Sequence, residues 1–587
     1  MDPIGDGIGS WAGSYPPQPL HDYALLADGE RGALIGPRGE IAWMCVPRWD
    51  DEPVFGSLLG EGLCAVTPVG GRFVWGGYYE EGSLIWRSRW VTGAAVVEAR
   101  EALVRPADPG TAVLLRQLTC RQGNARLRVV LDPRVGGGAE GLRDLECVAG
   151  VWHARLGGLS VRCGGFSAAH VDDRGALVAE IDLHEGRLHD LVIEIGRRAP
   201  TGPFPSAGTA WRATERVWQQ DVPAVEGIWA RRDVRLAVAV IAGMTSASGG
   251  MVAAATRSLP ERAERGRDFD YRYAWLRDQA MVGQALAAIG PHRLMVNAVD
   301  FVAARLREDG AHVRPAYAVD GGPVPGQDRC DTPGYPGAVD HVGNDAAEQF
   351  QLDVFGEALH LFAAAAGHGP LSADVWKSVE CAVAAIEESW WRPDAGIWEL
   401  RRRRWTHSRQ MLSSGLDRVA GLAPSAQAQD WRLLAERIDR SLDEEFRHPS
   451  GRWQRAADDA GVDAALLIPV VRSRADPARD LTTRRTVQAV LDELTEEEFC
   501  YRYRHGDLDL EEAEGAFVLA GFQMAMALHR LGEHPLAARW FERNRAACAA
   551  SGLFSEEYDV SQRQQRGNLP QAFVHGALVE AAAMLSR

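Results

Sequence analysis

Lysine is almost absent from this sequence. Its 587 residues include 64 basic ones, of which Lys377 is the single lysine and arginine supplies the rest. Acidic residues outnumber them, and the formal net charge is -16. A chain of this charge repels polyanions, so nucleic acid and anionic membrane surfaces are poor partners. A small neutral substrate is the better expectation.

Cysteine is scarce too, and its nine residues are scattered, with no CxxC pair among them. An odd number without paired spacing argues against a disulfide framework and against a zinc site. We therefore expect reduced and mostly buried thiols.

Long apolar runs are also missing, since no stretch of about 18 uncharged apolar residues occurs. The N-terminal segment MDPIGDGIGSWAGSYPPQPL has no basic stretch followed by an apolar one, so we expect no secretory signal and a cytoplasmic location. A composition of 46% hydrophobic and 25% charged residues is typical of globular proteins.

The pattern of the chain changes once along its length. Up to about Arg198, short apolar stretches alternate with turn residues, as in TAVLLRQLTCRQGNARLRVVLDP, which favours antiparallel strands. The segment RRAPTGPFPSAG is rich in Pro and Gly and marks a boundary. We predict an N-terminal antiparallel β-sandwich with its leading segment over residues 1–206, and a second domain over residues 207–587 that starts with a linker helix.

Beyond the boundary the apolar residues recur with a helical period. One helix is predicted from Asn344 to Ala366, with Asn344 or Asp345 as its N-cap. Residues 516–531 are apolar on nearly every face, as expected of a helix inside a second ring of helices. About a dozen helices without a fixed-period repeat permit an (α/α)6 barrel, although periodicity alone does not exclude a helical solenoid. Further helices are predicted over residues 227–244, 277–290, 295–307, 371–391, 407–422, 427–446, 481–491, 535–550 and 569–586.

Four clusters in the helical half mix aromatic and charged side chains, which can stack on sugar rings and bind hydroxyls. They are RDFDYRYAWLRDQAM, WWRPDAGIWELRRRRWTHS, FCYRYRHGDLDLEEAEGAF and GLFSEEYDVSQRQQRGNLPQAFVHG. Each cluster alone has a simpler explanation, such as a helix-start ion pair or a solvated charged loop. In the second, Glu399 lies between Trp398 and Leu400, and apolar neighbours favour the protonated carboxyl that a general acid needs.

In this order the clusters resemble those of glycoside hydrolase family 15, which comprises glucoamylases, glucodextranases and bacterial trehalases. The similar elements are GEIAWMCVPRWDDEPVFGSLL, ATRSLPE, DYRYAWLRD, GNDAAEQFQLDVFGE, GIWELR, EAEGAF and SEEYDVSQRQQRGNLPQAFVH, which span nearly the whole chain. The resemblance implies an (α/α)6 barrel with a pocket at one end. It also implies inverting hydrolysis of α-glucosides without a metal or an organic cofactor.

The same motifs imply individual roles. Glu399 matches the general acid, Glu556 the general base, and Tyr271 a tyrosine that helps to hold the attacking water. An inverting mechanism needs a protonated and an ionised carboxyl roughly 6.5–9.5 Å apart, and nearby Arg563 and Arg566 are expected to keep Glu556 ionised. The substrate-binding residues implied are Trp275, Arg277, Asp278, Trp398, Arg502 and Glu514.

Two positions depart from the family pattern. Ser413 in SRQMLSSGLDR and Gln523 in FVLAGFQMA stand where many bacterial relatives have tryptophan. Loss of these aromatics is expected to alter packing or the aglycone side of the pocket, which bears on the substrate more than on the reaction.

The leading functional prediction is an inverting, exo-acting α-glucoside hydrolase of the glucoamylase or α-glucosidase type, which releases β-glucose from short α-linked gluco-oligosaccharides. Trehalase is the close alternative, because the motifs are shared. More distant alternatives are a glycoside phosphorylase, which would lack the carboxylate base, and a catalytically silent glycan-binding protein. The sequence names no ligand for the first domain and leaves open a homo-oligomer.

Overall fold

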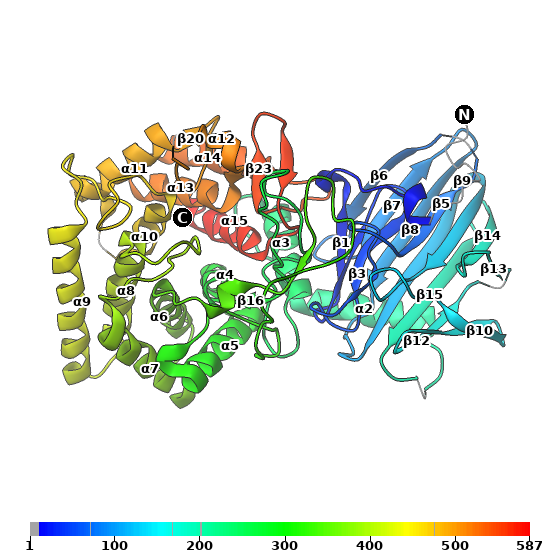
Figure 1. Cartoon of the computed structure of the whole chain (residues 1–587), viewed down its shortest axis with the longest axis horizontal. Helices are drawn as coiled ribbons and strands as arrows, with labels where there is room; N and C mark the ends of the chain where they lie inside the picture. The colour runs from blue at the N-terminus through cyan, green and yellow to red at the C-terminus, as the bar shows by residue number, and fades with distance from the viewer. Residues whose placement is uncertain (1–10, 71, 167, 200–201, 475, 507) are drawn as a thin grey trace.

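The computed structural model describes residues 11–70, 72–166, 168–199, 202–474, 476–506 and 508–587. The start of the predicted leading segment and part of the predicted boundary, residues 1–10 and 200–201, lie outside these ranges. The strands of the N-terminal part lie on one side of the molecule and the helices on the other (Figure 1). None of the helices described is long and apolar enough to cross a bilayer.

The N-terminal domain, over the residues described, is one antiparallel fifteen-stranded sheet. Along the first six residues of β8 the buried and partly exposed side chains alternate, because successive residues of a strand face opposite sides of the sheet. The strands are β1 (Ala24–Ala27), β2 (Gly32–Ile35), β3 (Glu40–Cys45), β4 (Pro53–Phe55), β5 (Leu63–Pro68), β6 (Val74–Tyr79), β7 (Trp86–Val91), β8 (Ala95–Leu103), β9 (Thr111–Asp132), β10 (Arg143–Val148), β11 (Val151–Leu156), β12 (Leu159–Gly164), β13 (His170–Val171), β14 (Leu177–His184) and β15 (Leu188–Gly196).

The long strand β9 makes two layers out of this sheet. Its first part pairs with β8 and β15, and its second part pairs with β5 and β14. Between the layers, the buried pair Arg116–Glu101 is 2.5 Å apart, and Arg116 also donates to the carbonyl of Gly39 at 2.6 Å. The antiparallel β-domain predicted from the turn spacing is confirmed.

The helical domain contains a closed inner ring. In the part of the chain described, α4, α6, α8, α10, α13 and α15 each contact the next, and α15 contacts α4. A second layer packs outside them, so the predicted (α/α)6 barrel is confirmed and the solenoid is excluded. The inner helices are α4 (Leu276–Ala288), α6 (Asp353–Ala366), α8 (Thr406–Ala420), α10 (Leu467–Arg472), α13 (Val518–Arg530) and α15 (Ala572–Leu585), and the outer ones are α3 (Arg231–Met244), α5 (Arg293–Asp309), α7 (Ala373–Ser389), α9 (Ser425–Glu445), α11 (Leu481–Glu493) and α14 (His534–Arg545). The remaining helices are α1 (Trp11–Ser14), α2 (Ala207–Asp221) and α12 (Leu510–Ala513).

The helix predicted from Asn344 begins instead at Asp353. Asn344 caps a short 3-10 turn by accepting a hydrogen bond from the amide of Ala346 at 2.9 Å. Further along, the amide of Leu352 donates to the side chain of Asp394 at 3.3 Å, which stabilises a non-helical approach to α6. The apolar residues before α6 therefore belong to a loop.

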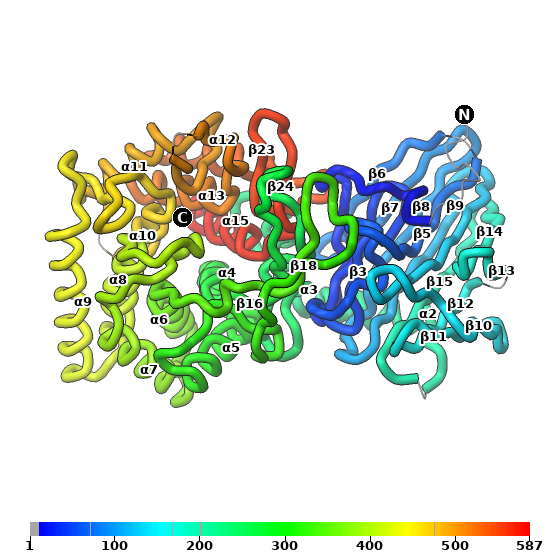
Figure 2. Tube along the Cα trace, viewed as in Figure 1, coloured from blue at the N-terminus to red at the C-terminus, as the bar shows by residue number. Residues whose placement is uncertain are grey.

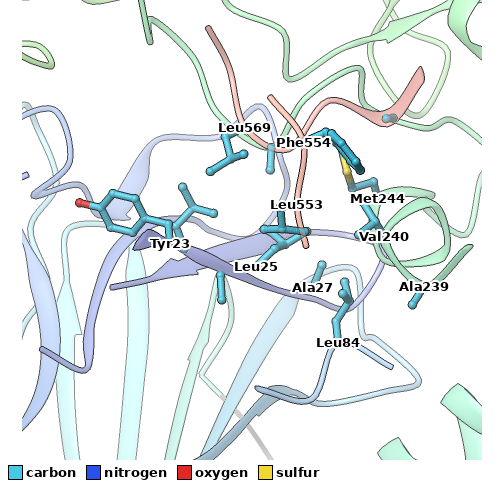
Figure 3. Close-up of a cluster of buried hydrophobic side chains, with 14 of the residues drawn as sticks. Tyr23, Leu25, Ala27, Leu84, Ala239, Val240, Met244, Leu553, Phe554 and Leu569 are labelled. Atoms are coloured by element: carbon cyan, nitrogen blue, oxygen red, sulfur yellow. The ribbon is translucent and has the colours of Figure 1, made fainter. Parts of the chain in front are cut away.

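The two domains share one hydrophobic core. Figure 3 shows Leu25 and Ala27 of β1 beside Val240 and Met244 of α3, together with Leu553 from the last loop of the barrel. Two short strands, β18 (Asp328–Arg329) and β19 (His341–Val342), form a hairpin whose loop reaches the first domain. There the amide of Gly334 donates to the carbonyl of Leu59 at 2.7 Å, and the two segments run side by side in Figure 2.

Arg272 is the central polar residue of this junction and is fully buried. Its guanidinium pairs with Asp270 at 2.7 Å and donates to the carbonyls of Trp49 and Asp51 in the first domain, at 3.1 and 2.9 Å. The guanidinium carbon also lies 5.9 Å from the ring centroid of Trp43. The PRWDD part of the first-domain motif therefore serves the contact between domains.

Replacing Arg272 by methionine should destabilise the whole chain by about 3–5 kcal/mol, because it leaves the buried Asp270 unpaired. The thermal unfolding midpoint is the measurement. Arg143→Met, at a side chain that is 66% exposed, is the matched control and should change the midpoint little. Equal midpoints for the two variants would contradict the role given to Arg272.

Candidate active site

A pocket opens at the N-terminal ends of the inner helices. It is a narrow pocket, with a cavity volume of about 60 Å³. The first turns of α4, α13 and α15 contribute to its wall. The structure brings eight of the nine predicted site residues to this pocket, namely Tyr271, Trp275, Arg277, Asp278, Trp398, Glu399, Arg502 and Glu556.

Glu399 presents one carboxylate oxygen to hydrogen-bond donors and leaves the other open. Its Oε1 accepts from Nε1 of Trp275 at 2.6 Å, from Arg277 at 3.3 Å and from Gln351 at 3.4 Å. Among the described residues, none donates to Oε2. If this carboxyl carries a proton, the proton therefore lies on Oε2. The Glu399 side chain is 21% exposed, so it is partly open to the pocket.

The loop that carries Glu399 is fixed by a buried carboxylate. Asp394 accepts hydrogen bonds from Ser408 at 2.8 Å and from Arg409 at 2.7 Å, and it also caps the amide of Gly396 at 3.1 Å. Gly396 supplies a positive φ of 68°, and Glu399 itself has a φ of 58°, which is unusual for a residue with a Cβ. Such a conformation persists only where its surroundings enforce it.

Glu556 is enclosed, in contrast to Glu399. It precedes β23 (Glu557–Asp559), which pairs with β22 (Ala516–Phe517) and β24 (Gln564–Arg566). Its carbonyl accepts from the amide of Val518 at 3.2 Å, and the residue is only 4% exposed. Gly567 packs against it so closely that a Cβ there would lie 3.2 Å from both the Cβ and Oε2 of Glu556. The structure thus fixes the position of this carboxyl on the pocket wall.

Behind Glu556, one guanidinium joins three buried carboxylates. Nη2 of Arg502 donates to Glu261 at 3.0 Å, to Glu514 at 2.5 Å and to Glu557 at 2.9 Å. The carboxylate oxygens lie within 4.8 Å of one another, close enough to hold a cation, but the guanidinium of Arg502 already bonds to all three. Arg267 adds a second positive charge, 2.5 Å from Glu261 and 3.4 Å from Glu514.

This cluster sets the electrostatics of Glu556. Burial raises the pKa of the Glu556 carboxyl well above its usual value, and the negative charge of Glu261 raises it further, while Arg502 and Arg267 oppose both effects. Burial and the charge of Glu261 likewise raise the pKa of Glu557. The pocket wall beside Glu556 is therefore rich in carboxyl groups. These carboxyl groups compete for the positive charge of Arg502 and Arg267.

The prediction that Arg563 and Arg566 keep Glu556 ionised is wrong. Arg563 is exposed, and Arg566 donates to Asp559 at 3.3 Å. The arginines that act on Glu556 are Arg267 and Arg502, which come from two other segments of the chain. Proximity in the sequence therefore did not identify the charges nearest to Glu556 in the fold.

Glu514 is the predicted site residue that does not line the pocket. It is fully buried behind Arg502 and lies 3.0 Å from His505. Burial raises its pKa, but Arg502 and His505 lower it by more, and the net value is about 2. Glu514 is thus a permanent anion that orients Arg502, and it does not touch the space a ligand would fill.

Tyr271 lies near both carboxyls. Its ring packs edge-on against Trp275, with the centroids 5.4 Å apart. Burial raises the pKa of its phenol well above the usual value, and the charges of Glu556, Glu261 and Glu399 raise it further. The hydroxyl therefore stays protonated and can donate a hydrogen bond in the pocket.

The start of α4 supplies an opposite-charge pair. Nη1 of Arg277 donates to Gln351 at 2.8 Å, and the same Gln351 contacts Glu399, so the loop before α6 connects the two. Burial raises the pKa of Asp278 to about 7, with Arg277 opposing this shift and Glu399 adding to it. Trp398 completes this side of the pocket and donates from its indole nitrogen to Asp463 at 2.8 Å.

Several residues of the site were not predicted. Glu261 lies in the ATRSLPE element and Glu557 directly follows Glu556, so both could have been proposed from the motifs. Gln351 was assigned to a helix, and its side-chain contact depends on the loop that replaces that helix. Phe517 and Phe573 also line the pocket. They end the sequences EAEGAF and NLPQAF, and as uncharged residues they did not stand out in a search for charged clusters.

The two departures from the family pattern lie away from the pocket. Ser413 lines a different cavity, beside Asp439. Gln523 is 1% exposed on α13, and its amide has no hydrogen-bond partner among the described residues. Altered packing is therefore the expected consequence that these positions favour, and the effect on the aglycone side stays a prediction.

The backbone at Glu399 predicts an unusual order of stabilities. Glu399→Gly should be more stable than Glu399→Ala by about 1 kcal/mol, because glycine adopts a positive φ without the Cβ clash. Glu215, within the helix α2, is the matched control, and there glycine should be the less stable substitution by a similar amount. Thermal unfolding of the four variants measures both differences, and the same order at both positions would contradict the strain at Glu399.

Comparison with known proteins gives consistent results for both domains. The model of "Glycosyl hydrolases family 15" matches residues 234–583, and that of "Trehalase-like, N-terminal" matches residues 9–143. A trehalase of Mycobacterium tuberculosis is 30% identical, with coverage of 97% of this chain and 90% of the relative. A trehalase of Mycolicibacterium smegmatis is also 30% identical, with 97% and 92% covered.

A solved structure supports the fold. A bacterial glucoamylase complexed with acarbose superposes with a TM-score of 0.72 over 99% of this chain and 96% of that chain, at 13% sequence identity. At that identity the likeness concerns the arrangement of the β-domain and the barrel. Together with the matching family model and the near full-length relatives, it leads to one conclusion: the chain belongs to glycosyl hydrolase family 15 and is a glycosidase.

Proposed function

We propose that this chain is a trehalase, which hydrolyses α,α-trehalose with inversion at one anomeric carbon. The observation that carries the proposal is similarity over nearly the full length of both chains to proteins named trehalase. The match of the first domain to a trehalase-like model adds to it. The glucoamylase-like activity predicted first from the sequence is supported less well than its trehalase alternative.

In the proposed reaction, Glu399 and Glu556 act on opposite sides of the bond that breaks. Glu399 donates the proton from Oε2 to the glycosidic oxygen, while Trp275 and Arg277 hold Oε1 and stabilise the carboxylate that remains. Glu556 removes a proton from the attacking water, and Tyr271 donates a hydrogen bond to that water. Both carboxyls line the same pocket, as an inverting mechanism requires.

The remaining residues hold the sugar. Arg277 and Asp278 offer donors and acceptors for neighbouring hydroxyls, and Trp275 and Trp398 offer aromatic surface to a ring face. Arg502 uses Nε and Nη2 on buried carboxylates, so Nη1 is the nitrogen left for a ligand. We propose that its first task is to hold the cluster beside Glu556 and that contact with the sugar is its second.

Trehalose gives this proposal a distinctive product signature, because the substrate joins two anomeric carbons. Inversion at the attacked carbon produces β-glucose, and the leaving glucose keeps its α configuration. Equal amounts of the two anomers should therefore appear before mutarotation. Proton NMR of the first turnovers measures this ratio, with maltose, isomaltose and kojibiose as competing substrates.

The same assay tests the assigned residues. Glu399→Gln and Glu556→Gln should each lower kcat on trehalose by about 10²–10⁴-fold, because each removes one proton transfer. Preferred turnover of maltose would favour the glucoamylase-like alternative, α-glucose alone would exclude inversion, and formation of glucose 1-phosphate would identify a phosphorylase.

The charge of Glu261 should set the acid limb of the pH profile. Glu556 must be ionised to act as a base, and Glu261 raises its pKa. Glu261→Gln removes that charge and frees Arg502 and Arg267, so the pKa of Glu556 falls and the acid limb of kcat/KM moves to lower pH. Glu512→Gln, at an exposed carboxylate, is the control and should leave the limb in place. A limb that stays or moves to higher pH in Glu261→Gln would refute this assignment.

A further inference from the structure

Trp398, on the wall of the candidate active site, is held by a residue that lies outside all the sequence motifs. Its indole nitrogen donates to Oδ1 of Asp463 at 2.8 Å, and Asp463 is only 3% exposed. The indole ring packs edge-on against Phe517, with the centroids 5.2 Å apart. Asp463 itself does not line the pocket. It can therefore act on a bound sugar only through another residue.

Two further contacts fix the carboxylate of Asp463. Its Oδ1 also accepts from the amide of Ala465 at 2.8 Å and so caps the 3-10 helix η4 (Ala464–Leu466). Its Oδ2 accepts from Nε of Arg455 at 3.2 Å. The guanidinium carbon of Arg455 lies 3.7 Å from the ring centroid of Tyr503, so this arginine is stacked as well as paired. Because both oxygens have fixed partners, the fold sets the direction in which Oδ1 faces the indole.

The turn that carries this carboxylate also contacts another part of the pocket wall. The amide of Ala464 donates to the carbonyl of Arg502 at 2.9 Å. Arg502 in turn holds the carboxyl cluster beside Glu556. On the other side, Trp398 directly precedes Glu399 in the sequence. One short turn therefore connects the segment of the proposed acid with that of the proposed base.

We propose that Asp463 is a positioning residue that determines how tightly the pocket holds the sugar. By accepting from the indole N–H it sets the plane of the Trp398 ring, and stacking depends on the angle between that ring and the sugar face. Without this acceptor the N–H is left unpaired, and the ring turns to find another partner. Glu399 keeps its place, because Asp394 fixes its loop. The inference rests on the proposed role of Trp398 in holding the sugar.

Steady-state kinetics of the full-length chain on trehalose test the proposal. Asp463→Ala should raise KM about tenfold and change kcat less than about threefold, because it weakens binding and leaves the proton transfers in place. Asp463→Asn keeps an oxygen that accepts from the indole, so its KM should lie within about twofold of the wild-type value. Asp459→Ala is the matched control. It removes another carboxylate, 3.8 Å from Arg455, and should leave KM unchanged.

A double-mutant cycle separates this role from a general effect on the fold. Trp398→Phe removes the indole N–H and keeps an aromatic ring, so in that background Asp463→Ala should raise KM much less. Loss of the turn cap, in contrast, lowers the thermal unfolding midpoint equally in both backgrounds. If Asp463→Ala does not fold, Asp463→Ser takes its place in the cycle, because serine also caps a turn but is one bond shorter.

The proposal is overturned by an unchanged KM in Asp463→Ala, or by equal increases of KM in the two backgrounds. An increase in Asp459→Ala as large as that in Asp463→Ala would overturn it too. The cycle does not depend on the linkage hydrolysed. If the wild type hydrolyses maltose and not trehalose, the proposed trehalase function fails, and the same cycle on maltose still tests Asp463.

Discussion

The contact on which the site depends is that of Arg502 with three buried glutamates. Glu261, Glu514 and Glu557 come from three different segments, and their carboxyl oxygens lie within 4.8 Å of one another. Ionised carboxylates this close repel one another, and the guanidinium of Arg502 offsets that repulsion. A guanidinium has several donors in a fixed plane and can satisfy more than one carboxylate at once. Because Glu556 directly precedes Glu557, the ion cluster also fixes the position of Glu556, the proposed base.

The two carboxyls assigned to catalysis differ in their surroundings in a way that suits different tasks. Glu399 is partly open, and donors on one side determine which oxygen can carry a proton. Glu556 is enclosed among other carboxylates, and its ionisation depends on the share of positive charge it receives from Arg502 and Arg267. The protein thus controls the two groups by different means, hydrogen bonds for one and a balance of charges for the other.

The elements with a regular apolar pattern could be predicted from the sequence, whereas short or irregular segments could not. The uniform apolarity of α13 predicted an inner helix, and the turn spacing predicted the β-domain. The inner helix α10, Leu467–Arg472, was missed because six residues are too few to show a period. Asn344 was read as a helix cap because its capping preference is the same for a 3-10 turn.

In the candidate site, too, some features could be predicted from the sequence and others could not. Motif similarity led to eight residues that share a pocket, since motifs record the residues themselves. Charge partners were predicted poorly: Arg563 lies exposed in the hairpin turn, and Arg566 pairs with Asp559 although its strand lies beside Glu557. Long-range pairing depends on the fold and leaves no trace in local composition.

The position of Arg272 next to Tyr271 has a consequence for how this enzyme could be divided or recombined. In an extended segment, adjacent side chains face opposite ways. Tyr271, which we propose holds the attacking water, faces the pocket, whereas Arg272 beside it is anchored in the first domain. The β-domain is therefore a structural part of the reaction chamber and not a detachable accessory. A barrel excised on its own, or fused to a foreign β-domain lacking the carbonyls of Trp49 and Asp51, would lose the anchor that aligns one wall of that chamber.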